Sequence, residues 1–171
     1  MPDLIIRLKK KSDGSSALSC VRADGSTTWQ RQEGQLGRFF PLHDLTHFAV
    51  ESVLGWRRGF YGLLAEGWDI TDFGKDERKG HVPPDAAIAE AIVGFFDLER
   101  ATGERASADD FKWKVDAYCE AHGLPRLSLA VTDDQVGRIR ALRADLFARW
   151  DALPAGEVLE LSFDRETTSA A

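Results

Sequence analysis

Two histidines and two acids lie close together in the segment 41–51, PLHDLTHFAVE. His43 and His47 are two of the chain's 4 histidines, and they are four residues apart. Asp44 follows the first histidine, and Glu51 lies four residues after the second. On a helix, where each residue turns roughly 100° from the one before it, these four side chains share an arc of about 100°. Imidazole and carboxylate groups on one face can bind a metal ion or transfer protons.

The apolar residues of this segment predict what surrounds the polar arc. The opposite side of the helix carries a core-facing stripe of apolar side chains, namely Leu45, Phe48, Ala49, Val53 and Trp56. Val50 and Leu54, however, directly flank the histidines. Apolar residues at the edge of a polar arc indicate that another part of the chain packs over it. We therefore expect a groove away from the main core, in which each polar group needs a partner.

The spacing of the histidines favours a metal site, because imidazoles at positions i and i+4 of a helix can reach one ion. The five residues His43-Asp44-x-x-His47 resemble the His-Glu-x-x-His helix of zinc-dependent proteases, with Asp in place of Glu. This resemblance implies a divalent metal, zinc before others, bound by His43 and His47. It implies that Asp44 is the general base that activates a metal-bound water. Glu51 would be a third ligand or would orient an imidazole.

Further acids and one histidine downstream could complete the metal site, and they are Glu66, Asp69, Asp72 and His81. With a metal bound, metal-assisted hydrolysis is the expected reaction. Two hypotheses need no metal. In the first, Asp44 or Glu51 orients one imidazole, which acts as a general base. In the second, the histidines and acids form a structural cluster that is hydrogen-bonded to the sheet or to the following loop.

The segment 56–74, WRRGFYGLLAEGWDITDFG, combines aromatic side chains with glycines. Glycine destabilises a helix by about 1 kcal/mol relative to alanine, so tight turns are expected here. Such a segment can form a compact helix-turn-helix in the core, or a pocket wall with candidate substrate-contacting residues Trp56, Arg57, Arg58, Glu66, Trp68 and Asp69. An alternative function uses the same aromatics, over 56–73, as an exposed patch for a protein partner or for a homodimer.

The remaining sequence predicts the elements that position this site. Period-two patterns predict strands at 4–10, 17–23, 26–32 and 157–163, with Asp24-Gly25 as the hairpin turn between the second and third. Period-3.6 patterns predict helices at 42–56, 59–66, 84–101, 107–122 and 132–151. Capping boxes open the last two helices at Ser107 and Thr132. We expect an α+β fold, in which a three-stranded antiparallel meander plus a C-terminal strand carries a layer of four to five helices.

Length and composition limit the function classes. A chain of 171 residues predicts a single domain over 1–171, with a frayed tail at 164–171. The net charge of −6 argues against nucleic acid as a partner. No signal peptide or membrane-spanning run is apparent, and the 2 cysteines form no Cys-x-x-Cys pair. We therefore expect a cytoplasmic protein that contacts no membrane and binds an unknown small molecule or protein.

Overall fold

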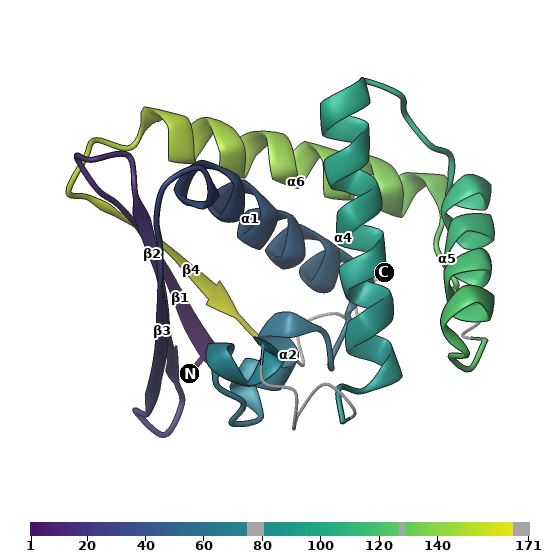
Figure 1. Cartoon of the computed structure of the whole chain (residues 1–171), viewed down its shortest axis with the longest axis horizontal. Helices are drawn as coiled ribbons and strands as arrows, with labels where there is room; N and C mark the ends of the chain where they lie inside the picture. The colour runs from purple at the N-terminus through teal and green to yellow at the C-terminus, as the bar shows by residue number, and fades with distance from the viewer. Residues whose placement is uncertain (75–80, 127–128, 166–171) are drawn as a thin grey trace.

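The computed structural model describes residues 1–74, 81–126 and 129–165. It has an α+β fold, in which a four-stranded antiparallel sheet carries its helices on one face (Figure 1). Helix α1 lies between the sheet and α4, and α5 lies farthest from the sheet (Figure 1). This arrangement confirms the predicted fold class.

The sheet joins the two ends of the described chain. Its strands are β1 (Leu4–Lys10), β2 (Ser16–Arg22), β3 (Thr27–Gln32) and β4 (Val158–Phe163). Their order is β3-β2-β1-β4, so β1 pairs with both β2 and β4. Alternate residues of β1 are buried, which is the pattern of a sheet covered on one face only. The predicted addition of the fourth strand to the N-terminal meander is confirmed.

The helices follow the predicted order. They are α1 (Leu36–Leu54), α2 (Phe60–Ala65), a 3-10 helix (Ile70–Gly74), α4 (Pro84–Thr102), α5 (Ala108–His122) and α6 (Asp133–Ala152). Both predicted capping boxes are present at the starts of α5 and α6. Of the tail predicted over 164–171, the structure describes Asp164 and Arg165, both of which are hydrogen-bonded to Asp3. Residues 166–171 lie outside the described residues.

The first long helix begins six residues before its predicted start at residue 42. Pro41 lies inside this helix and lacks the N–H that would bond to the carbonyl of residue i−4. That carbonyl belongs to Gly37, and the Ser16 hydroxyl, whose closer acceptor is Gln32 Oε1 at 2.8 Å, lies 3.3 Å from it. A polar contact from β2 therefore compensates in part for the missing backbone bond, and the helix continues through Pro41.

Two apolar clusters meet on α1. One lies between the sheet, α1 and α6, and it includes Leu45 and Leu146. The other lies between α1, α4, α5 and α6, and it includes Val50 and Phe96. Because both sides of α1 are covered, four of its polar residues are buried, namely Asp44, Thr46, His47 and Glu51. Among the described residues, no helix combines the length and the apolar character needed to cross a membrane.

Candidate metal centre

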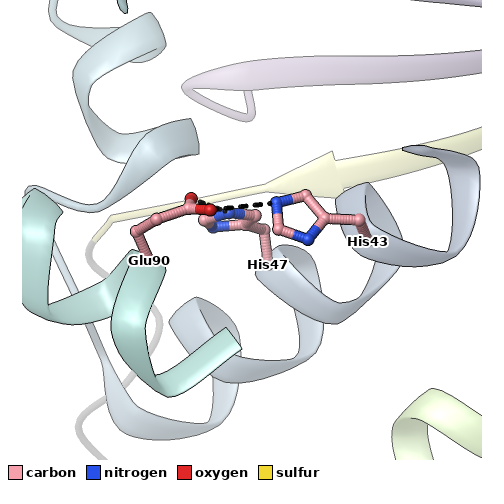
Figure 2. Close-up of side chains that lie close together, drawn as sticks. All are labelled: His43, His47 and Glu90. Carbon is pink, nitrogen blue, oxygen red and sulfur yellow. Dashed lines mark hydrogen bonds and ion pairs between the residues drawn. The ribbon is translucent and has the colours of Figure 1, made fainter. Parts of the chain in front are cut away.

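The two histidines of α1 project toward α4, where Glu90 faces both rings (Figure 2). His47 is 2% exposed, and the side chain of His43 is 13% exposed. The two rings contact each other edge to face, with centroids 4.9 Å apart. The predicted groove over the polar arc is therefore closed by α4, whose Glu90 lies 43 residues after His47 in the chain.

The distances among these three side chains suit a metal ion. His43 Nε2 lies 3.3 Å from Glu90 Oε1, and His47 Nε2 lies 2.8 Å from Glu90 Oε2. One nitrogen or oxygen from each residue lies within 4.8 Å of the other two. Two ligands of a tetrahedral zinc ion are about 3.3 Å apart when each bond is about 2.05 Å long. Small side-chain movements would thus allow the three residues to hold an ion.

The second nitrogen of each imidazole, Nδ1, also contacts a carboxylate. His43 Nδ1 lies 2.7 Å from Asp97 Oδ2, and His47 Nδ1 lies 3.2 Å from Glu51 Oε1. An ionised carboxylate only accepts hydrogen bonds, so it favours an N–H at Nδ1 and leaves the Nε2 lone pair free for a metal. Metal-binding histidines commonly have such a carboxylate partner.

Glu51 is held by the backbone that follows α1. Its carboxylate accepts hydrogen bonds from the N–H groups of Tyr61 and Gly62, at 3.0 and 3.2 Å from Oε2. Gly59 permits this approach, because a Cβ at that position would lie only 2.5 Å from the Glu51 carboxyl carbon. The structure places Glu51 behind His47 and outside the group of three, although the sequence interpretation offered it as a ligand and a catalytic residue.

In this cluster, hydrogen bonds outweigh burial in setting the pKa values of the two histidines and of Glu90. Burial would lower the pKa of each imidazole, but hydrogen bonds to Asp97 and Glu90 raise the pKa of His43 to about 9. Those to Glu51 and Glu90 raise the pKa of His47 to about 10. Burial would raise the pKa of Glu90, but its hydrogen bonds with the two histidines hold it well below the usual range. At neutral pH both rings are then protonated at both nitrogens, and a divalent cation would replace the proton on Nε2 of each ring.

A pocket of about 180 Å³ opens beside the histidines. Both histidines, Glu90 and Asp44 line it, and Asp44 Oδ2 accepts a hydrogen bond of 2.8 Å from Gln32 Nε2. Ser16 Oγ donates in turn to Gln32 Oε1. The remaining wall is formed by Leu18, Gln30, Phe40, Phe60 and Ile70. Sites for drug-sized molecules have about 300–1,000 Å³, so this pocket suits a smaller molecule or a single chemical group.

Asp44 is 4% exposed, yet its carboxylate borders the pocket. Burial raises its pKa to about 6, although the hydrogen bond from Gln32 opposes this shift. A carboxyl group with a pKa near neutrality can exchange a proton under physiological conditions. The arrangement therefore combines three potential ligands with one potential proton acceptor.

The six residues predicted from segment 56–74 as substrate contacts do not line this pocket. Trp56 is half-buried and donates to the Asp85 carbonyl. Arg57, Arg58 and Glu66 border a separate surface hollow, where Arg58 pairs with Glu66. Trp68 packs against the core cluster beside the sheet.

Arg22 holds the turn that carries the last of these six residues. It forms an ion pair with Asp69 at 3.0 Å and donates to the carbonyls of Leu64 and Trp68. The contribution of this segment to the pocket comes instead from Phe60 and Ile70, two residues that its aromatic and glycine pattern did not single out.

The downstream candidates for a third ligand also lie elsewhere. Glu66 and Asp69 are paired with arginines. Asp72 is buried, and one of its oxygens accepts a hydrogen bond from the Asp69 N–H. His81 is exposed. The group that could hold a metal takes its third member from α4.

Glu90 and Asp97 are the site residues that sequence reasoning missed. They are seven residues apart, which places them on one face of α4 about two turns from each other. His43 and His47 are one turn apart on α1, so Glu90 lies opposite Nε2 of both rings while Asp97 reaches Nδ1 of His43. The sequence does show that these two acids share one face of a helix beside an apolar stripe. It does not show that this face packs against the histidines.

Comparison with family models, with curated proteins and with solved structures finds no match to this chain. The site is therefore interpreted from its own geometry and chemistry.

Proposed function

We propose that the protein binds one divalent metal ion, zinc before others, through His43 Nε2, His47 Nε2 and a carboxylate oxygen of Glu90. The proposal rests on one observation, which is that both nitrogens of each imidazole contact a carboxylate. Each Nδ1 has its own carboxylate, Asp97 or Glu51, while both Nε2 atoms face the same third carboxylate.

We propose further that the metal ion supports hydrolysis of a small substrate. Catalytic zinc sites have three protein ligands and keep the fourth position for water, and a set of two histidines and one glutamate is typical of them. The three residues border a small pocket from which water or substrate could reach that position. The ion would supply an activated water, whose pKa falls to about 7 on zinc.

Asp44 and Glu51 have different roles in this proposal. Asp44 borders the pocket and is held by Gln32, so it would accept the proton of the attacking water. Glu51 is 1% exposed and contacts Nδ1 of His47, so it would orient that ring. The sequence motif implied the base role of Asp44, and the structure supplies a hydrogen bond that would orient its carboxylate.

The alternative function, a protein-interaction module, requires exposed aromatics over 56–73. The described aromatics of this segment are buried or half-buried, namely Trp56, Phe60, Tyr61, Trp68 and Phe73. None of them is exposed, which argues against a surface patch in the described part of the segment. A homodimer that uses other surfaces stays a prediction.

The first experiment is elemental mass spectrometry on tag-free protein. We expect about one equivalent of zinc per chain, and we expect it to be lost in the His43→Ala/His47→Ala and Glu90→Gln variants. The matched control is His122→Ala, because His122 is exposed on α5 and bonds to the Tyr118 carbonyl. Absence of metal from the wild type, even after incubation with divalent ions, would overturn the metal centre.

The second experiment tests hydrolysis separately from metal binding. Zinc-loaded protein is screened against small ester, amide and phosphoester substrates, with Asp44→Asn as the test variant. We expect Asp44→Asn to retain zinc and to lose at least about 100-fold in kcat. Stoichiometric zinc without any turnover would reject hydrolysis and leave the metal centre in place. Bound iron in place of zinc would add oxygen-dependent reactions to the screen, because two histidines and one carboxylate can also hold iron for oxygen chemistry.

A further inference from the structure

Another polar hollow is lined by residues from the last turn of α4, the segment that follows it and α6. It has a volume of about 380 Å³ and no lining residue in common with the pocket beside the histidines. We call it the arginine groove. Its lining consists of Glu99, Arg100, Gly103, Arg105, Arg140, Arg143, Ala144 and Phe147.

The unusual member of the arginine groove is Arg143, which is 6% exposed. Its Nε donates to Thr46 Oγ1 at 3.1 Å, and its Nη2 donates to the Phe96 carbonyl at 3.2 Å. The guanidinium lies over the rings of Phe96 and Phe147, at 5.1 and 5.2 Å from their centroids. These contacts fix the position of the cation, but all of them are with uncharged groups.

Within the described part of the chain, Arg143 forms no ion pair and its Nη1 forms no hydrogen bond. A buried charge normally has a partner of opposite charge, since removal from water is unfavourable. Burial accordingly lowers the pKa of this guanidinium. A cation fixed at the wall of a groove, with one free donor nitrogen, is a feature of an anion-binding site.

The other arginines leave a surplus of positive charge in the arginine groove. Arg140 is neutralised by Glu99 through two hydrogen bonds of 2.8 and 2.7 Å. Arg100 Nη2 lies 3.9 Å from Asp97 Oδ1, but the other oxygen of Asp97 is bonded to His43. Arg105 is exposed and has no ion pair with any described residue. This surplus occurs in a chain whose net charge is −6.

We propose that the arginine groove binds a phosphate group, through Nη1 of Arg143 together with Arg100 and Arg105. Guanidinium groups match the geometry of phosphate oxygens and can each donate two parallel hydrogen bonds. The surrounding hollow leaves room for the rest of a small phosphorylated molecule. No residue lines both this groove and the pocket beside the histidines, although Asp97 bonds to His43 and its Oδ1 lies 3.9 Å from Arg100.

The test is isothermal titration calorimetry of chelator-treated, full-length protein with inorganic phosphate at low salt. Chelation removes any metal that would itself bind phosphate. We expect Arg143→Lys to weaken phosphate binding by about tenfold or more, because the lysine ammonium lacks the planar group that holds Nη1 in place while Nε and Nη2 bond to Thr46 and to the Phe96 carbonyl. We expect Arg105→Gln, a change at an exposed residue, to weaken it about threefold to tenfold.

The matched control is Arg138→Gln, which removes an exposed arginine of α6 that does not line the arginine groove. It lowers the net charge equally, so it should leave phosphate affinity within about twofold of the wild type. No detectable binding at about 10 mM phosphate would overturn the proposal. Equal losses in Arg138→Gln and Arg105→Gln would also overturn it, since they would indicate an unspecific charge effect.

A second titration distinguishes two sources of the phosphate group. Glycerol 3-phosphate binding at least about tenfold more tightly than inorganic phosphate would assign the arginine groove to a phosphorylated small molecule. Equal affinities would assign it to the free ion. Either result supports a phosphate site, provided that Arg105→Gln weakens the binding.

Discussion

Two polar clusters on opposite sides of Asp97 differ in their balance of charge. The histidine cluster, formed by His43, His47, Glu51, Glu90 and Asp97, places a carboxylate at each imidazole nitrogen. The arginine groove contains a buried guanidinium without such a partner in the described chain. Excess negative charge around neutral ligand atoms favours a cation, whereas excess positive charge favours an anion. The two sites therefore suit ligands of opposite charge.

Two residues contact both clusters. Asp97 bonds to His43 through Oδ2, and its Oδ1 lies 3.9 Å from Arg100. Phe39 stacks on the His43 ring with centroids 5.4 Å apart, and Arg100 lies 6.0 Å from its ring centre. Substitutions in either cluster, and at these two bridging residues, therefore test the comparison.

The largest effect is expected from Glu51→Ala, which removes a buried negative charge from the histidine cluster. The change leaves the N–H groups of Tyr61 and Gly62 and the imidazole of His47 without their acceptor. We expect the free energy of unfolding to fall by about 3–5 kcal/mol in urea titrations of metal-free protein. The control is Glu160→Ala, whose partner Arg7 is half-exposed, with an expected loss of about 0–1 kcal/mol. Similar losses in both variants would contradict the importance of the buried carboxylate.

A pH titration separates the two clusters, because only the histidine cluster changes charge near neutrality. A histidine with a raised folded-state pKa stabilises the fold fully below its unfolded value of about 6.5 and loses that contribution as pH rises through the folded value. With pKa values of about 9 for His43 and about 10 for His47, metal-free protein should lose at least ~2 kcal/mol between pH 6.5 and 9. Urea titrations at several pH values measure this loss.

Zinc should reduce this loss of stability at alkaline pH, since imidazoles that bind the metal have already released their Nε2 protons. Equal pH slopes with zinc and with chelator would argue against metal binding at these rings. At acid pH the sign is reversed for Glu90, whose lowered pKa gives a stabilisation that is lost as pH falls below about 4.5.

Asp97→Asn should change the two sites in opposite directions. The variant removes a negative charge from His43, so zinc affinity should fall by about 10–100-fold in competition with a chelating dye. It also removes a negative charge beside Arg100, so phosphate affinity should rise by about twofold to fivefold. Asp116→Asn, on the exposed side of α5, is the control and should change neither affinity. A change of the same sign at both sites would break the comparison.

The smallest effect is expected from Phe39→Ala. Because its ring is 40% exposed and contacts both His43 and Arg100, we expect zinc and phosphate affinities to fall by no more than about threefold each. Trp29→Ala, on an exposed aromatic of β3, provides the control. A loss above about tenfold at only one site would show that Phe39 serves that site alone.

Local patterns in the sequence were sufficient for most of the fold. Alternation predicted all four strands, and serine and threonine caps predicted the starts of α5 and α6. The predicted start of α1 was wrong, because the Ser16 hydroxyl that lies near the Gly37 carbonyl belongs to another element. Helical spacing predicted that His43 and His47 lie together, but the positions of Glu90 and Asp97 beside them depend on how α4 crosses α1. A single sequence contains little information about contacts between elements that are far apart in the chain.

The pairing of β1 with β4 has a consequence for folding kinetics. Arg7 and Glu160 meet across 153 residues, and closing so long a loop costs about 4 kcal/mol of chain entropy before its contacts form. Helix α1 packs on the sheet that contains this pair. We therefore expect slow folding, because the sheet is complete only after the two ends of the described chain have met.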